Sequence, residues 1–306
     1  MRILVTGVSG YVGGVLLSRL RRERHELVGL TRDAGGPAAT LGIPLVEGDV
    51  ITGRGLERAL AEVEVAYYLI HSLEPTASER FEELERRGAC NFARAARRAG
   101  VRRVIYLGGP APSHGRLSMH LRSRLAVEKI LLSACEDAVA LRSSIVIGAG
   151  SRAFRLLVRL VERMPVVPIP AWGSHRSAPV DERDAIEALA RAAGSSQIGG
   201  RALDLRGPEL VSYRELIGRI ADALVISRPL VKLPGVNLTP LTSRLAARIA
   251  GEQHALVGPL MESLEDDLLP RAEDALELLG IRPHSLERAI EHALREWEQV
   301  EPLRAR

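Results

Sequence analysis

The chain has 306 residues, of which 46% are hydrophobic and 26% are charged, and its formal net charge is +4. These proportions are typical of a folded globular protein and exclude an intrinsically disordered chain. No stretch approaches the ~18 apolar residues that a membrane span needs. Met1 leads directly into the strand-like run RILVTG without a separate apolar leader, so we expect a cytoplasmic location.

The basic residues do not favour a nucleic-acid partner. Nearly all are arginines, and many alternate with glutamates in helix-like segments such as ERFEELERRG, a pattern typical of solvated helix faces. Three Phe and two Trp supply few rings for base stacking. Cys90 and Cys135 lack the spacing of a disulfide framework or a metal site, and we interpret both as small buried hydrophobic residues. We therefore expect no nucleic-acid partner and no metal.

The first half of the chain alternates short apolar runs with helical patterns. Near-continuous apolar strands separated by helices indicate a parallel sheet covered on both faces, so we predict a Rossmann-type, doubly wound α/β fold. Gly100 closes the longest helical pattern as a left-handed stop. The predicted strands are 2–7, 26–32, 43–50, 65–70, 101–109 and 138–148, and the predicted helices are 11–25, 55–63, 77–100 and a segment around 118–130.

The pattern changes after about residue 150. A proline-rich stretch, 164–180, cannot form a regular helix, and helical patterns dominate beyond residue 207. Ser285 is placed to cap a helix with one apolar stripe. We predict a dinucleotide-binding domain over 1–150, with about 178–206 returning to it. A smaller, mainly helical C-terminal substrate lobe then comprises 151–177 and 207–306.

The stretch VTGVSGYVGG has the spacing G-x-x-G-x-x-G between a predicted strand and a predicted helix. In such a loop the first glycine permits a tight turn, the second lets the backbone approach a pyrophosphate, and the third lets the helix pack on the strand. The free N–H groups and the dipole of the helix start hold the phosphates. We assign to dinucleotide binding Gly7, Ser9, Gly10, Tyr11, Val12 and Gly13.

The end of the second predicted strand bears on which dinucleotide binds. An NAD site usually has a carboxylate here for the ribose 2′-hydroxyl, whereas this strand closes with Thr31 and Arg32. The Arg32 guanidinium suits a 2′-phosphate, so we predict NADP(H) in preference to NAD(H). Asp33 follows directly and keeps NAD(H) open.

The EGDV segment after the third strand contributes two further candidates. Asp49 can accept a hydrogen bond from the adenine amino group, and Val50 can pack against the ring. On its own this segment is also compatible with an ordinary turn.

Together these motifs resemble the atypical and extended branch of the short-chain dehydrogenase/reductase superfamily, with similarity to NmrA-like and YbjT-like NAD(P)H-binding proteins. The resemblance covers nearly the whole chain. It rests on TGVSGYVG, GDV, YLIHSL, RRVIYLGG, LRSSIVIGAGS, PVDERDAIEAL and LRGPELVSYRELIGRIADAL. It implies that the substrate lies between the nicotinamide ring and the C-terminal lobe. It also implies a possible homodimer through the helices around 80–100 and 118–133.

The same resemblance implies further residues around the cofactor. Leu69, Ile70 and His71 would line the ribose, and Gly108 would face the nicotinamide end. The segment that includes Ser144 and Ile145 would pass beside the nicotinamide ring.

Members of that superfamily typically use a serine, a tyrosine and a lysine for catalysis, and this set is absent here. The fifth strand ends LGG without the serine, and alignment of HLRSRLAVE with YxxSKxxxE puts His120 at the tyrosine and Arg124 at the lysine. Histidine can donate a proton near neutral pH, and Arg124 can keep the ribose-binding role of the lysine. The alternative is that both residues merely contact the cofactor or solvent.

Two functions therefore remain open from the sequence. The first is an NADP(H)-dependent oxidoreductase, or an epimerase or isomerase, acting on a small organic substrate. The second is a non-catalytic NADP(H)-binding redox sensor or regulatory or assembly protein, which the missing Ser-Tyr-Lys set favours. We prefer the first interpretation.

Overall fold

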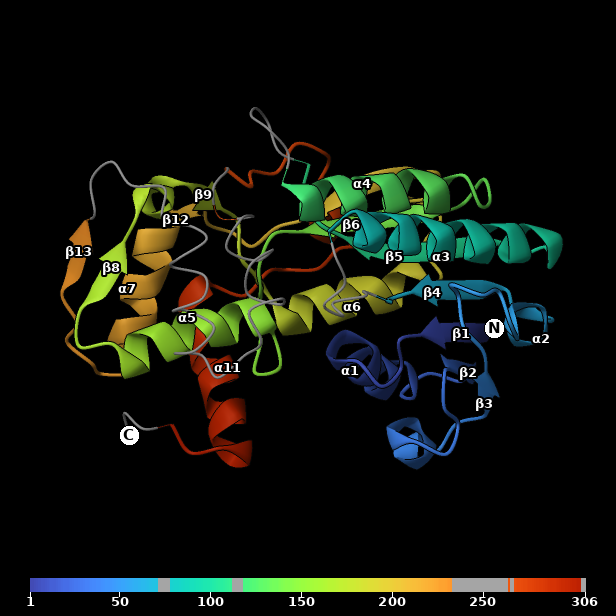
Figure 1. The fold of residues 1–306 in the computed structure, drawn as a ribbon, viewed down its shortest axis with the longest axis horizontal. Helices are drawn as coiled ribbons and strands as arrows, with labels where there is room; N and C mark the ends of the chain where they lie inside the picture. Colours follow the sequence, from blue (N-terminus) through green and yellow to red (C-terminus); the bar gives the residue numbers. More distant parts are fainter. Residues whose placement is uncertain (71–77, 112–117, 233–263, 265–266, 304–306) are drawn as a thin grey trace.

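Seven short strands form one parallel sheet in the order β11-β6-β5-β4-β1-β2-β3 (Figure 1). The structure is a computed structural model that describes all residues except 71–77, 112–117, 233–263, 265–266 and 304–306. The Rossmann-type α/β prediction is confirmed, since β1 lies inside the sheet between β2 and β4 and the strand order reverses there. The strands are β1 Arg2–Thr6, β2 Glu26–Thr31, β3 Leu45–Glu47, β4 Val65–Tyr68, β5 Arg103–Gly108, β6 Val139–Ser143 and β11 Arg201–Leu205.

Helices cover both faces of this sheet (Figure 1). Helices α2, α3 and α4 share one buried cluster with the sheet, and α1, α6 and α10 share another on the opposite face. Gly100 follows α3 with a φ of 69°, the left-handed stop that the sequence predicts. The bounds are α1 Tyr11–Leu20, α2 Leu56–Leu60, α3 Ser78–Arg98, α4 Met119–Leu132, α6 Glu182–Ala192 and α10 Ala275–Leu278.

The strand predicted over 138–148 divides into two, which corrects the sequence-based assignment. β6 ends at Ser143, and β7 (Val146–Ile147) leaves the main sheet to pair with β10 (Val180–Asp181). The Ser144 hydroxyl donates to the Ala178 carbonyl, and the Val180 N–H donates to Ile145 O. These bonds between the two segments take the place of continued pairing with β5.

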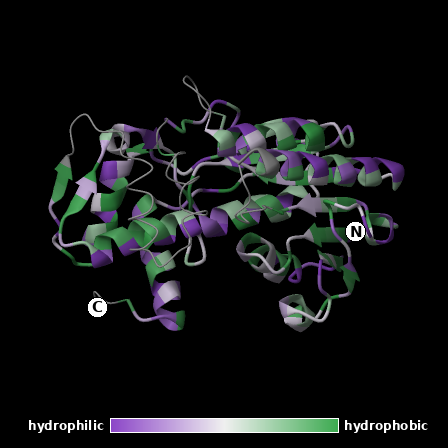
Figure 2. Cartoon of the chain, in the orientation of Figure 1, coloured by the Kyte–Doolittle hydropathy of each residue, from purple (hydrophilic) through white to green (hydrophobic). Residues whose placement is uncertain are grey.

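The remaining elements form a smaller body with its own buried cluster, seen to the left in Figure 1. Its predicted cap at Ser285 is present, because Ser285 Oγ accepts the Arg288 N–H at 3.4 Å. Polar and apolar residues alternate along α11, as Figure 2 shows, and its apolar residues from Leu286 to Trp297 are buried. The elements are α5 Arg152–Arg163, β8 Val167–Ile169, η2 Ala171–Ser174, β9 Arg176–Ser177, β12 Val211–Ser212, α7 Tyr213–Ala223, β13 Leu230–Lys232 and α11 Leu286–Val300; η1, Pro37–Leu41, belongs to the sheet domain. The division of the chain into two domains stays an interpretation.

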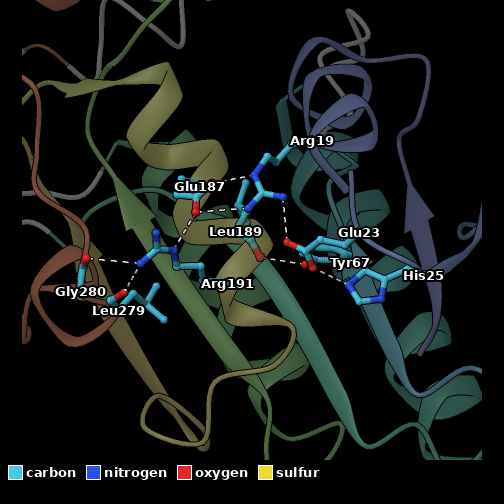
Figure 3. A network of polar contacts seen from close by, with 9 residues as sticks. All are labelled: Arg19, Glu23, His25, Tyr67, Glu187, Leu189, Arg191, Leu279 and Gly280. Carbon is cyan, nitrogen blue, oxygen red and sulfur yellow. Dashed lines mark hydrogen bonds and ion pairs between the residues drawn. The ribbon is translucent and has the colours of Figure 1, made fainter. Parts of the chain in front are cut away.

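A network of hydrogen bonds and ion pairs connects α1 to α6 on the surface of the sheet domain (Figure 3). Glu187 accepts from Arg19 Nε and from Arg191 Nε, each at 2.7 Å. Behind it, the buried Tyr67 hydroxyl donates to the Leu189 carbonyl at 2.8 Å. These bonds hold the middle of α6 beside the last turn of α1 and over β4. Among the helices that the structure describes, none combines the length and hydropathy required to cross a bilayer.

Candidate functional site

The turn from β1 into α1 is shaped by its glycines. Gly7 has a φ of 66°, and a Cβ there would lie 2.7 Å from Leu69 O. A Cβ on Gly13 would overlap the Gly7 carbonyl oxygen, so the helix is packed directly on the turn. The Gly10 N–H donates to that same Gly7 oxygen at 2.9 Å and closes the turn.

This turn fits a dinucleotide pyrophosphate. Ser9 and Gly10 are exposed at its tip, at the carboxyl edge of β1, while the preceding Thr6 is fully buried. Helix α1 begins at Tyr11, so the N–H groups of Tyr11 and Val12 have no acceptor within the helix and are available to an anion. Among the residues that the structure describes, no side chain caps the helix, which leaves that role open to a ligand.

The end of β2 presents Arg32 and Asp33, both exposed. Asp33 Oδ1 accepts the Gly35 N–H at 2.9 Å, and a Cβ on Gly36 would lie 2.9 Å from Asp33 Oδ2. The carboxylate is therefore held against its own loop. This arrangement weakens the case that Asp33 accepts from a ribose hydroxyl.

The loop after β3 is held by hydrogen bonds from Asp49 within the loop and from Asn91 of α3. Asp49 is partly buried, and its Oδ1 accepts the Ile51 N–H at 2.8 Å. The Asn91 amide donates to the carbonyls of Val50 and Ile51, each at 2.9 Å. The Val50 side chain is 5% exposed and lies in the core beside Gly88, so its predicted contact with adenine depends on the little surface it retains.

The end of β4 touches the glycine turn. The Leu69 N–H donates to Thr6 Oγ1 at 3.0 Å, and Leu69 and Ile70 are both partly exposed at the same edge as the turn. His71 lies outside the described residues. The assignment of these three residues to the cofactor ribose stays a prediction.

Helix α4 places the two candidate catalytic residues one turn apart. Ser118 Oγ accepts the Leu121 N–H at 3.2 Å and caps the helix, and His120 lies in its first turn, partly buried. The Arg124 guanidinium donates to Leu107 O near the end of β5 and lies 5.1 Å from the centre of the Tyr106 ring. Arg124 thus faces the strand end where Gly108 lies.

Tyr106 is not a substitute for the missing tyrosine. It is 1% exposed, and its hydroxyl donates to Arg124 O at 3.4 Å. Burial raises the pKa of Tyr106 to about 12, and Arg124 opposes that rise only in part. The ring belongs to the core between β5 and α4.

A buried ion pair joins α4 to β6 behind Gly108. Arg142 Nε and Nη2 donate to the two carboxylate oxygens of Glu128 at 2.8 and 2.6 Å, and the Glu128 side chain is 5% exposed. Hydrogen bonding to Glu128 raises the pKa of the Arg142 guanidinium. A Cβ on Gly108 would lie 3.6 Å from Glu128 Oε2, so the pair supports the strand end directly.

Ser144 and Ile145 lie where β6 leaves the sheet. Ser144 Oγ donates to Ala178 O at 3.1 Å, and Ile145 is 4% exposed within the core of the smaller body. Only backbone atoms of Ile145 are therefore suited to line the predicted nicotinamide site. Among the described residues, no group of three His, Cys, Asp or Glu side chains is arranged to hold a metal.

Sequence reasoning missed one titratable residue of this region. Glu182, the first residue of α6, is 8% exposed, and burial followed by the charge of Glu296 raises its pKa to about 7. In the sequence it stands in VDERDA, where charged residues at a helix start indicate a solvated turn. No local signal distinguishes it from its exposed neighbours.

The comparisons with known proteins agree with this geometry. The family model described as "NAD dependent epimerase/dehydratase family" matches residues 3–202. The chain is 26% identical over 234 residues to the ceramide reductase of Caulobacter vibrioides, which covers 76% of this chain and 73% of that protein. It also spans 25% of the length of an uncharacterized Mycobacterium tuberculosis protein, with 26% identity over 249 residues.

Two solved structures share the fold over almost the whole chain. The UDP-glucuronic acid 4-epimerase of Bacillus cereus, in complex with UDP-glucuronic acid and NAD, has a TM-score of 0.73 at 17% identity and covers 98% of this chain and 100% of its own. The triphenylmethane reductase of Citrobacter sp., complexed with NADP(H), has a TM-score of 0.73 at 18% identity and covers 96% and 100%. With the glycine turn, the strand order and the family model in agreement, the chain belongs to the NAD-dependent epimerase/dehydratase family.

Proposed function

We propose that the protein is an NADP(H)-dependent oxidoreductase that acts on a carbonyl or hydroxyl group of a small organic substrate. The observation that carries this proposal is the turn between β1 and α1, where Gly13 packs on Gly7 and the first helical N–H groups face outward. The similarity to a ceramide reductase supports a reductase in preference to an epimerase. When bound, the nicotinamide supplies or accepts hydride.

The protein's own residues would bind and orient the reactants around that ring. Arg124, held against Leu107 O, would carry a fixed positive charge at the end of β5 and contact the nicotinamide ribose. His120, one helical turn earlier, would donate a proton to the substrate oxygen. The buried pair of Glu128 and Arg142 would keep the ends of β5 and β6 in register beside them.

Replacement of Arg32 by alanine tests the choice of dinucleotide. Because the Asp33 carboxylate is held by Gly35, Arg32 is the group at the end of β2 suited to a 2′-phosphate. We expect Arg32→Ala to weaken NADPH binding about tenfold or more and to leave NADH binding within about twofold, since a charged hydrogen bond contributes about 1.5–3 kcal/mol. Titration of nicotinamide fluorescence measures both. Arg295→Ala, at an exposed position on α11, is the control.

Equal losses for NADPH and NADH would contradict the 2′-phosphate role of Arg32. Absence of binding of either nucleotide to the unmodified protein would contradict the proposed function itself. In that case the glycine turn would be retained only as a scaffold.

Variants of α4 test the chemistry. We expect His120→Ala to lower kcat by about 10²–10⁴-fold, the usual contribution of general acid catalysis, with little change in dinucleotide affinity. Arg124→Ala should weaken dinucleotide binding as well, because its guanidinium lies at the end of β5, where the nicotinamide ribose would bind. Single-turnover hydride transfer and fluorescence titration separate the two effects. Arg122→Ala is the matched control, since Arg122 is exposed on the same helix and binds Glu82.

Unchanged turnover in both His120→Ala and Arg124→Ala would remove these residues from the mechanism. A non-catalytic dinucleotide sensor is the second candidate, favoured by the absence of serine, tyrosine and lysine at their usual places. This candidate predicts that the unmodified protein binds the nucleotide but turns over no carbonyl substrate.

A further inference from the structure

Two polar oxygens are buried together behind the glycine turn. The Tyr11 hydroxyl and Glu182 Oε2 are both inaccessible to solvent and have no hydrogen-bond partner in the part of the chain that the structure describes. A Cβ on Gly148 would overlap both oxygens, so they lie against the same side of Gly148 and close to one another. Buried polar atoms without partners are rare in native proteins and call for an explanation.

Their surroundings are poor in polar groups. A cavity of about 10 Å3 borders both side chains, at the lower limit for a single water, and its other walls are aliphatic. They are Val12, Val15, Leu107, Val146, Ala185, Ile186 and Leu189. An ionised carboxylate is strongly disfavoured in such a place, whereas a protonated carboxyl can donate to the Tyr11 oxygen.

The charges that act on Glu182 favour its neutral form further. Glu296 of α11 faces it and raises its pKa, and Glu296 is itself paired with His292 at 3.3 Å. Arg183 on the same helix opposes this effect less strongly, because its guanidinium binds both oxygens of Asp181, at 3.0 and 2.6 Å. The pKa of Glu182 is therefore raised to about 7, within the range where proteins work.

Tyr11 connects this cluster to the dinucleotide site. It is the first residue of α1, so its N–H belongs to the turn that faces the pyrophosphate, while its ring lies against Gly148 and Gly150 on the opposite side. We propose that the Tyr11–Glu182 pair is a proton-linked support for the dinucleotide loop, in which Glu182 keeps its proton while the dinucleotide is bound. This inference rests on the proposed dinucleotide function and adds to it a regulation by pH.

The sign of the effect follows from the charges. Above about pH 7 Glu182 loses its proton in the empty protein, and the new negative charge lies beside the Tyr11 side chain, whose backbone N–H is at the start of α1 where the pyrophosphate would bind. For the dinucleotide to bind, either Glu182 must take up a proton again, or binding must overcome the repulsion between the Glu182 carboxylate and the pyrophosphate across a poorly solvated interior. Dinucleotide affinity must therefore fall as the pH rises through this range.

The experiment is a titration of the full-length protein with NADH between pH 6.0 and 8.5. NADH is the probe because its charge is constant between pH 6.0 and 8.5. The 2′-phosphate of NADPH, like other phosphate monoesters, titrates at about pH 6. We expect the Kd of the unmodified protein for NADH to rise about three- to tenfold over this range. This corresponds to a difference of about one unit or less between the pKa of Glu182 in the free and in the bound protein. Glu182→Gln should remove this dependence.

Two further variants separate this linkage from titration of histidines near the site. Glu296→Gln should move the midpoint of the pH dependence to lower pH, because the repulsion that keeps Glu182 neutral is gone. Glu162→Gln is the control, since Glu162 is equally buried but binds Arg159 within the smaller body. It should leave the dependence unchanged.

An unmodified protein that binds NADH with the same Kd from pH 6.0 to 8.5 would overturn the inference while leaving the proposed function intact. A pH dependence retained in Glu182→Gln would do the same. If neither nucleotide binds at all, the proposed function fails first, and thermal unfolding still tests the titration of Glu182. The gain in Tm from Glu182→Gln should then grow between pH 5 and 7 and level off above, and a constant difference would overturn it.

Discussion

Replacing Gly13 by alanine is expected to weaken dinucleotide binding about ten- to hundredfold and to destabilise the protein. The added Cβ would overlap the Gly7 carbonyl oxygen, which is backbone and already accepts the Gly10 N–H. Helix α1 must therefore move away from the turn, and insertion of one methyl group into such a contact typically costs about 1–3 kcal/mol. Since about 1.4 kcal/mol corresponds to tenfold in Kd, the loss falls in that range. Fluorescence titration and urea unfolding measure the two effects.

Gly14 provides a matched control one residue later. A Cβ there would lie 3.8 Å from Val8 O, which is an ordinary van der Waals contact. Gly14→Ala adds the same atom to the same helix, and alanine is the better helix former by about 0.8–1 kcal/mol. We expect unchanged dinucleotide affinity and equal or slightly higher stability. Similar losses in both variants would show that α1 is sensitive to any substitution, and the specific contact of Gly13 with Gly7 would lose its support.

The fold was accessible from the sequence because its signals are local and repeated. Apolar strands alternating with helices predict the parallel sheet, and the glycine spacing predicts the sharp turn that the structure shows at Gly7. The cap at Ser285 and the stop at Gly100 are likewise properties of a few neighbouring residues. Such features depend on backbone geometry that residue types restrict directly.

The polar chemistry of the site was less accessible, because it depends on pairs distant in the sequence. Nothing near Glu182 indicates that Tyr11, 171 positions earlier, would bury it, and nothing in LRSSIVIG shows that pairing would pass from β5 to β10 after Ser143. Arg124 could be aligned with a lysine, yet its bond to Leu107 O requires the packing of α4 on β5. These contacts follow from the tertiary fold and not from any local pattern.

The second large effect is expected from Glu128→Gln. The amide would keep the shape of the carboxylate but remove the charge that both Arg142 nitrogens bind, at 2.8 and 2.6 Å. Loss of one partner from a buried ion pair typically costs about 3–5 kcal/mol, because the other charge is left without compensation. The Arg142 side chain is 17% exposed, so we expect a loss of about 3 kcal/mol in the free energy of unfolding. The midpoint of urea unfolding measures this loss.

A double variant distinguishes the attraction between the two charges from the cost of burying them. Glu128→Gln with Arg142→Met removes both charges, and we expect it to be more stable than Glu128→Gln alone, since no uncompensated guanidinium remains. Glu83→Gln, which breaks an exposed pair with Arg86 on α3, should leave the unfolding midpoint unchanged. If the double variant were no more stable than the single one, packing at the strand end rather than charge would account for the loss. Because Glu128 lies against Gly108, the single variant should also lower dinucleotide affinity, whereas Glu83→Gln should not.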